Sequence, residues 1–268
     1  MDFKGKVIVV TGGGSGIGRA CVQAFFERNG NVAVVDRDKK AGEETIEYLR
    51  GPGVAQYFQA DVSAQIQVAQ LIPQIASSMG GIDVLVNNAG IQRYGTATST
   101  SEEEWEEVMN VNLKSAFLMS KYALPKIIER GGGAIVITGS AQSVSAVRNS
   151  VAYVVSKHGL LGLTRSLALD YAKDNVRVNC VCPGAIDTPM LRWSASLDAN
   201  PEKVLDACAR IHALGRMGKP EEVANTIAFL SSDLASFITG AAIMVEGGLL
   251  VPAGGMAFQE SGTGGAAK

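Results

Sequence analysis

The sequence has few of the residues that mark several classes of protein. Its 268 residues include only two histidines and four cysteines, and aromatic residues make up 6% of the chain. The cysteines have no spacing typical of a disulfide framework, and we expect no metal site. Cys180 and Cys182 alternate along an apolar segment, which favours buried free thiols. These scarcities exclude a small disulfide-stabilised domain.

Basic tracts and long apolar runs are also missing. The formal net charge is -2 with no cluster of lysine and arginine, so we expect neither nucleic acid nor an anionic membrane as a partner. Glycine or charged residues interrupt the apolar runs well short of a membrane span. Met1 leads almost directly into the first apolar run, so we expect no signal peptide, reduced thiols and a cytoplasmic location.

Short apolar segments alternate with stretches of helical period along the chain. Nearly continuous apolar strands separated by helices predict an α/β fold with a buried parallel sheet and helices on both faces. We expect one domain over residues 1–251, with a long irregular or helical insertion at 185–215, and a Gly/Ala-rich tail over 252–268. The predicted strands cover residues 6–10, 31–36, 55–61, 83–87, 134–138, 176–181 and 241–245.

A glycine-rich turn, Thr11-Gly-Gly-Gly-Ser-Gly-Ile-Gly18, follows the first predicted strand and opens a helix. Glycines in such a turn let the backbone approach a pyrophosphate, and the helix N-terminus supplies free N–H groups. Asp36 ends the second predicted strand, where a carboxylate binds the ribose hydroxyls and repels a 2′-phosphate. Since the turn carries no basic residue to offset that repulsion, the sequence predicts NAD as the cofactor.

Ser140, Tyr153 and Lys157 form the second informative group. Tyr153 and Lys157 are four residues apart and share one face of a predicted helix. An ammonium beside a phenol lowers the pKa of the phenol, so the tyrosine can serve as a base. Ser140 follows the predicted strand 134–138, at the sheet edge where ligands bind in open α/β folds. This pattern indicates hydride transfer with a nicotinamide cofactor.

Together these motifs resemble the short-chain dehydrogenases/reductases over nearly the whole chain. The resemblance implies a Rossmann-type doubly wound sheet of about seven parallel strands, a small-molecule substrate and assembly as a homotetramer. The matching motifs, in chain order, are the turn at 11–18, Asp61-Val62, Asn87-Asn-Ala-Gly90, Asn110-Val-Asn112, the Ser140/Tyr153/Lys157 set and Pro183-Gly184 followed by Thr188.

The resemblance also implies a role for each catalytic residue. Tyr153 acts as general acid/base on the substrate oxygen, and Ser140 hydrogen-bonds that oxygen and stabilises its developing charge. Lys157 holds the nicotinamide ribose and lowers the pKa of Tyr153. Asn112 holds a water that links Lys157 to bulk solvent. The implied cofactor-binding residues are Gly12, Ser15, Gly16, Ile17, Gly18, Asp36, Asp61, Val62, Asn88, Tyr153, Lys157, Pro183, Gly184, Ile186 and Thr188.

Substrate choice in this family depends on variable positions, and several of them are arginines here. Gln92 and Arg93 follow the Asn-Asn-Ala-Gly motif, and Arg148 lies between Ser140 and Tyr153. Arg192 and Trp193 lie in segment 185–215, which the resemblance identifies as a mobile lid. A guanidinium pairs well with a carboxylate, so we expect one of these arginines to bind a substrate acid; solvent or a subunit contact is the alternative for each. The expected substrate residues are Gln92, Arg93, Ser140, Arg148, Tyr153, Arg192 and Trp193.

We therefore expect an NAD-dependent oxidoreductase that interconverts a secondary alcohol and a ketone on a small polar hydroxy acid, sugar acid or sugar derivative. The first alternative is a 3-oxoacyl-[acyl-carrier-protein] reductase, which Asp36 disfavours because that role usually goes with NADPH. The second is a 3-hydroxybutyrate dehydrogenase, but Ser150 stands where those enzymes carry lysine. The third is a nucleotide sensor or scaffold without catalysis, which the intact catalytic set disfavours.

Overall fold

The computed structural model describes residues 1–251. Seven parallel strands form one sheet in the order β3-β2-β1-β4-β5-β6-β7, which confirms the predicted fold class. The order reverses between β1 and β4, and in open α/β sheets ligands bind at such a switch point. The strands are β1 (Val7–Thr11), β2 (Asn31–Asp36), β3 (Val54–Gln59), β4 (Val84–Asn87), β5 (Gly133–Thr138), β6 (Val176–Pro183) and β7 (Ala242–Val245).

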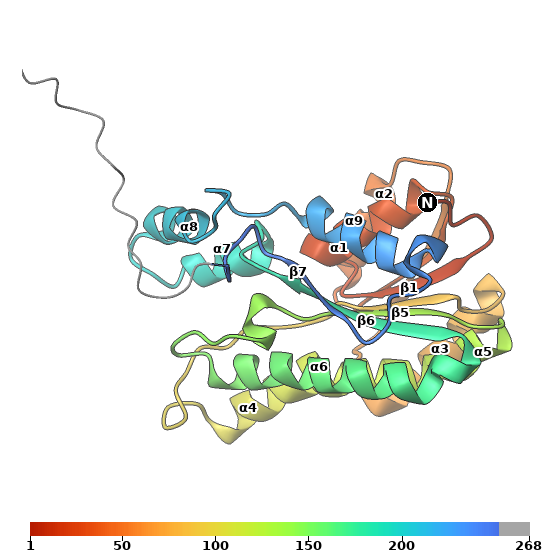
Figure 1. Cartoon of the computed structure of the whole chain (residues 1–268), viewed down its shortest axis with the longest axis horizontal. Coiled ribbons are helices and arrows are strands. Elements are labelled where there is room, and N and C mark those ends of the chain that lie inside the picture. The colour runs from red at the N-terminus through yellow and green to blue at the C-terminus, as the bar shows by residue number, and fades with distance from the viewer. Residues whose placement is uncertain (252–268) are drawn as a thin grey trace, which may run out of the picture.

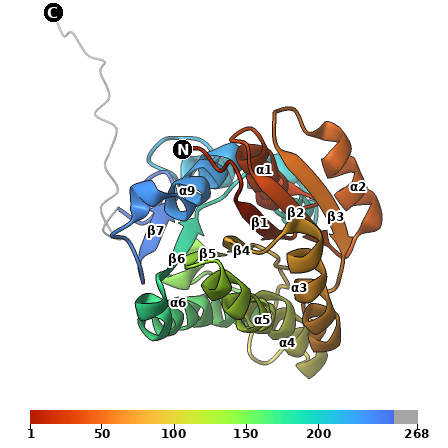
Figure 2. The same ribbon diagram turned by 90° about the vertical axis from the view of Figure 1, so that its right-hand side faces the viewer.

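Helices cover both faces of this sheet, as Figures 1 and 2 show. One layer contains α1 (Gly16–Phe26), α2 (Lys39–Tyr48) and α9 (Pro220–Ser231). The opposite layer contains α3 (Gln65–Met79), α4 (Glu102–Met109), α5 (Ser115–Glu129) and α6 (Val151–Tyr171). Within residues 1–251 no helix combines the length and apolar character of a membrane span.

Successive apolar side chains of the central strands point to opposite faces of the sheet, so both faces are buried under helices. In β5, Ile135 and Ile137 pack into the core cluster that includes residues of α3 and α5. Val136, between them, packs into the cluster that includes residues of α1 and α9. Successive strand residues point to opposite faces, so a continuous apolar strand supplies both layers. Cys180 and Cys182 of β6 are buried free thiols, as predicted.

Two local features shape the edge of the sheet where the strands end. The segment predicted as an irregular or helical insertion contains α7 (Pro189–Ala195) and α8 (Pro201–Arg210), which lie together at one end of the molecule in Figure 1. Between α4 and α5 the helix widens into one π-helical turn, Asn110–Lys114. Such turns occur frequently at functional sites, and this one carries Asn112.

Candidate active site

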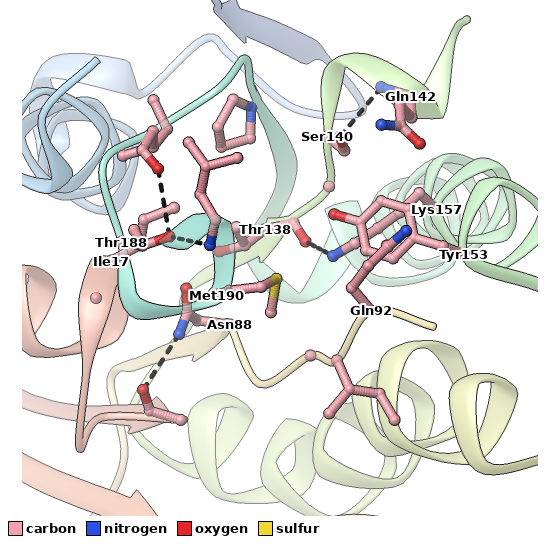
Figure 3. Close-up of a pocket in the computed structure, with 18 of the residues that line it drawn as sticks. Ile17, Asn88, Gln92, Thr138, Ser140, Gln142, Tyr153, Lys157, Thr188 and Met190 are labelled. Atoms are coloured by element: carbon pink, nitrogen blue, oxygen red, sulfur yellow. Dashed lines mark hydrogen bonds between the residues drawn. The ribbon is translucent and has the colours of Figure 1, made fainter. Parts of the chain in front are cut away.

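A cavity of about 700 Å³ opens at the carboxyl ends of the strands. Its lining runs from Asp36 and Asp61, beside the glycine-rich turn, past Ser140, Tyr153 and Lys157, to residues of α7 and the region after α8. This volume is ordinary for a site that binds a small molecule or cofactor. The cavity therefore brings together the two groups of residues that the sequence singled out, and Figure 3 shows its catalytic end.

The glycine-rich turn fits the pyrophosphate of a dinucleotide. Gly12 and Gly16 have φ angles of 63° and 50°, which favour glycine, and a Cβ at Gly18 would overlap the carbonyl oxygen of Gly12. Helix α1 begins here without a side-chain cap or an acidic residue in its first turn, whereas a side chain caps α2, α4, α7 and α8. The free N–H groups of α1 are suited to an anion.

Asp36 lies at the end of β2, where its carboxylate borders the cavity. Oδ2 accepts a hydrogen bond from the backbone N–H of Gly14 at 2.9 Å, and Oδ1 accepts one from Asp38 at 3.0 Å. A Cβ at Gly14 would lie 2.8 Å from Oδ2, so only glycine permits this approach. These contacts fix the carboxylate beside the turn, where an adenosine ribose would lie.

Thr11 joins the turn to the next strand across the switch point. Its Oγ1 accepts hydrogen bonds from the backbone N–H groups of Asn88 and Ala89, at 2.9 and 3.1 Å. The Asn88 side chain donates in turn to the Thr11 carbonyl at 3.1 Å. The pairing of β1 with β4 thus holds both cofactor-binding loops. The further predicted cofactor residues that line the cavity are Ser15, Ile17, Val62, Pro183, Gly184, Ile186 and Thr188.

The side chains predicted to be catalytic lie close together on α6 and beyond the end of β5. The buried ammonium of Lys157 donates a hydrogen bond to the Thr138 carbonyl at 2.9 Å and lies 5.5 Å from the centre of the Tyr153 ring. Ser140 lies two residues beyond β5, and its Oγ accepts a hydrogen bond from the Gln142 backbone at 3.1 Å. Figure 3 shows these side chains converging at the same end of the cavity.

Burial dominates the electrostatics of this site. It raises the pKa of the Tyr153 phenol above its usual range, and the Ser140 hydroxyl partly opposes that rise. Burial also lowers the pKa of Lys157 to about 8, with the Cys180 and Cys182 thiols acting in the opposite direction. The sequence predicted a lowered tyrosine pKa, whereas in the folded chain desolvation of the phenol sets the direction of the shift and raises that pKa.

Asn112 is held by the π-helical turn so that its amide reaches the loop after β4. Its Oδ1 accepts a hydrogen bond from the Ile91 N–H at 2.7 Å, and Nδ2 donates to the Ile91 carbonyl and to Ser156 Oγ at 3.0 and 3.1 Å. A Cβ at Gly90 would lie 3.4 Å from Asn112 Oδ1 and 3.7 Å from Lys157 Nζ. Asn112 thus lies near Lys157, while its role in proton relay stays a prediction.

The three arginines expected to bind a substrate acid do not line the cavity. Arg93 pairs with Glu107 at 2.9 Å, and Arg192 pairs with Asp187 at 2.7 Å. Arg148 lies in an exposed part of the loop before α6. Two of these guanidinium groups are paired with carboxylates, and the third is exposed to solvent. None of the three lines the cavity that contains Tyr153. Among residues 1–251, the cationic side chains that line the cavity are those of Arg37 and Lys157.

The part of the cavity lining near Tyr153 contains uncharged polar side chains instead. Gln92 lines the cavity as predicted, and its Nε2 donates to Ser150 Oγ at 3.1 Å. Trp193 lies outside the lining but stacks on Tyr94, which belongs to it, with ring centres 6.4 Å apart. Sequence reasoning named neither Tyr94 nor Met190 as lining residues, and no motif marks them. Gln142 also lines the cavity, because it directly follows the turn at Ser140.

Comparison with known proteins agrees with this geometry. Residues 12–250 match the family described as enoyl-(acyl carrier protein) reductase. The 2,5-dichloro-2,5-cyclohexadiene-1,4-diol dehydrogenase of Sphingobium indicum is 41% identical, and the meso-2,3-butanediol dehydrogenase of Serratia marcescens is 37% identical. Each match covers 92% of this chain, and 98% and 96% of the relative, respectively.

A solved structure gives the same result. The ligand-free aldohexose dehydrogenase of Thermoplasma acidophilum superimposes with a TM-score of 0.88 at 38% identity, over 96% of this chain and 98% of that one. The match in sequence and fold extends across both the turn and the catalytic set. This chain belongs to the short-chain dehydrogenase/reductase family and is an oxidoreductase that acts on an alcohol or ketone group with NAD or NADP as acceptor.

Proposed function

We propose that this enzyme uses NAD to oxidise one secondary hydroxyl of a small, uncharged substrate with several hydroxyl groups, such as a cyclic diol or a sugar derivative. The observation that carries the proposal is the lining of the substrate end. Gln92, Gln142, Ser145 and Ser194 supply uncharged hydrogen-bonding groups there. Hydroxyl groups both donate and accept hydrogen bonds, so amide and hydroxyl side chains are their natural partners.

Gln142 gives this proposal its sharpest support. Its side-chain oxygen is buried and has no hydrogen-bond partner among the described residues. An unsatisfied buried acceptor costs about 1–3 kcal/mol, which a substrate hydroxyl would recover by donating to it after a small rotation of the amide. A carboxylate could not donate in that way. The diol, butanediol and aldohexose dehydrogenases to which this chain is similar are named for substrates of this class, which supports the preference.

The catalytic residues divide the work of oxidation. NAD, held by the glycine-rich turn and Asp36, would supply the acceptor for the hydride of the carbinol carbon. Tyr153 removes the hydroxyl proton as general base, and Ser140 donates a hydrogen bond to the same oxygen as charge develops on it. Lys157 stabilises the phenolate form of Tyr153 through its charge. Closure of residues 185–215 over the cavity would strengthen each of these interactions by excluding water.

The choice of NAD over NADP rests on Asp36. Its fixed carboxylate borders the cavity beside the glycine-rich turn, where it would repel a 2′-phosphate on the adenosine ribose. Arg37, which also lines the cavity, is the cation that could oppose this preference. A 3-oxoacyl-[acyl-carrier-protein] reductase remains the second candidate, and a preference for NADPH would favour it.

We also propose that residues 185–215 close over the cavity within a single domain spanning 1–251. Met190, Leu191 and Ser194 of α7 line the cavity together with Cys208 and Ile211 at the end of α8. Closure of such a segment excludes water and completes an active site. Hydrogen exchange with and without NAD should show protection in this segment, and unchanged exchange would contradict the lid.

Self-assembly as a homotetramer belongs to the same proposal. An open apolar groove lies between α6 and the π-helical turn that leads into α5, with Phe117 48% exposed in it. Exposed apolar patches of this kind often mark protein interfaces. Light scattering coupled to gel filtration measures the mass directly, and a monomer would contradict the assembly. The groove is lined by Met109, Asn110, Leu113, Lys114, Phe117, Gly162, Leu163 and Ser166.

A panel assay at 340 nm tests the proposed activity. The panel should contain cyclic diols, sugars, polyols, the corresponding hydroxy acids and a 3-oxoacyl thioester, each with NAD(H) and NADP(H). We expect the largest kcat/KM with NAD and a neutral diol or sugar. A hydroxy acid or an oxoacyl thioester as the best substrate would overturn the proposed substrate class.

A further inference from the structure

His212 connects the lid segment to the loop that borders the cofactor end of the cavity. It lies just after α8, and its imidazole is 4% exposed. Nε2 accepts a hydrogen bond from the backbone N–H of Ala185 at 3.1 Å, and Nδ1 lies 2.7 Å from the Cys208 carbonyl oxygen. Only the neutral tautomer with its proton on Nδ1 satisfies both backbone groups.

The bond to Ala185 differs from the other backbone contacts of this loop. Gly184 donates to the Val245 carbonyl at 3.0 Å, and Asp187 donates to the Gly218 carbonyl at 2.9 Å. Gly218 donates back to the Ala185 carbonyl, also at 2.9 Å. Between these backbone pairs, the Ala185 N–H is paired with a side chain. The imidazole therefore replaces a strand carbonyl at the point where the loop turns into the cavity.

Packing reinforces this contact. A Cβ at Gly184 would lie 2.7 Å from His212 Nε2, so the imidazole rests directly against the loop backbone. Pro183, Gly184, Ala185 and Ile186 all line the cavity. A shift of the imidazole would therefore move the wall against which the nicotinamide end of the cofactor lies.

We propose that His212 is a positioning residue that holds the 183–186 loop in its cofactor-binding conformation through the Ala185 N–H. It touches neither the substrate nor the reacting atoms. The same ring also bonds the Cys208 carbonyl oxygen, so His212 links the 183–186 loop to the end of α8. The proposal rests on nicotinamide cofactor binding and is independent of the substrate named above.

Two substitutions of similar shape test the hydrogen bonds of the two ring nitrogens separately. His212→Gln places an amide oxygen near the position of Nε2, where it can still accept from Ala185. His212→Asn keeps a donor near the position of Nδ1 for Cys208 but leaves the Ala185 N–H without an acceptor. His158, the second histidine, is exposed on α6 and bonds only within its own helix, so His158→Asn is the matched control.

The test measures the dissociation constant for NADH, and separately for NADPH, by fluorescence titration without substrate. We expect about a tenfold weaker constant for His212→Asn, as for an orphaned buried donor, and less than about threefold for His212→Gln and His158→Asn. At saturating cofactor and alcohol, kcat should stay within about threefold for all variants that fold, since no reacting group changes.

Equal losses in His212→Gln and His212→Asn, or no loss in either, would overturn the positioning role. If His212→Asn does not fold, a His212→Gln enzyme with weakened NADH binding but a native melting temperature also overturns it. Failure of the wild-type protein to bind either cofactor is a separate outcome, which counts against the proposed function rather than against the comparison of variants.

Discussion

The Nζ atom of Lys157 lies 2.9 Å from the carbonyl oxygen of Thr138. The last residue of β5 therefore holds the lysine of α6 next to the Tyr153 ring. Strand and helix meet here because Thr138 ends β5 and Lys157 faces inward one turn after Tyr153. The ammonium gains one strong acceptor in a buried position, which fixes its direction. The geometry at this junction underlies the predictions for catalysis.

Replacing Tyr153 with phenylalanine should abolish most turnover while leaving cofactor binding intact. The ring and its packing remain, but the group that exchanges the proton is lost, which typically costs about 10²–10⁴-fold in rate. Steady-state kinetics give kcat, and fluorescence titration gives the NADH dissociation constant. Near wild-type turnover in Tyr153→Phe would show that another group is the general base.

Oxidation should accelerate with rising pH, because the base is the phenolate of Tyr153 and burial raises the pKa of that phenol. The Ser140 hydroxyl lowers this pKa, so Ser140→Ala should move the rising limb of kcat/KM to still higher pH. It should also reduce the rate about 10²-fold through loss of a donor to the reacting oxygen. Ser78→Ala, which removes an exposed hydroxyl on α3 outside the cavity lining, is the control. If the rising limb of the kcat/KM profile moved to lower pH in Ser140→Ala, the role given to Ser140 would be contradicted.

Asp36→Ala should relax cofactor discrimination. Hydrogen bonds to charged groups contribute about 1.5–3 kcal/mol, so kcat/KM with NAD should fall roughly 10- to 100-fold while that with NADP rises. Asp38→Ala removes a neighbouring carboxylate that does not line the cavity and should leave the ratio unchanged. A wild-type enzyme that prefers NADP would refute the assignment to NAD.

Gln142→Leu should raise KM for a diol or sugar about tenfold and affect a matched mono-alcohol far less, since one hydrogen bond to the second hydroxyl disappears. Arg148→Met should change neither value, because Arg148 lies outside the cavity lining. If Arg148→Met instead raises KM for a hydroxy acid but not for its amide, an arginine binds a substrate carboxylate and the neutral-substrate proposal fails.

The sequence by itself determined the order of strands and helices, the glycine-rich turn that suits a pyrophosphate, and the shared helix face of Tyr153 and Lys157. These follow from local rules: apolar runs such as β5 must be buried on both faces, and residues four apart such as Tyr153 and Lys157 share a helix face. The parallel sheet then brings every strand end to one edge. Such features can be predicted because neighbours along the chain decide them.

Only the tertiary structure decided which variable side chains face the cavity. Arg93 and Arg192 turn to Glu107 and Asp187, and Gln142 takes a place in the cavity, because contacts between separate elements outweigh position along the chain. The pKa of Tyr153 was decided in the same way: the sequence places an ammonium nearby, but the depth of burial sets the direction of the shift. Burial and pairing depend on the whole fold, which spacing in the sequence does not specify.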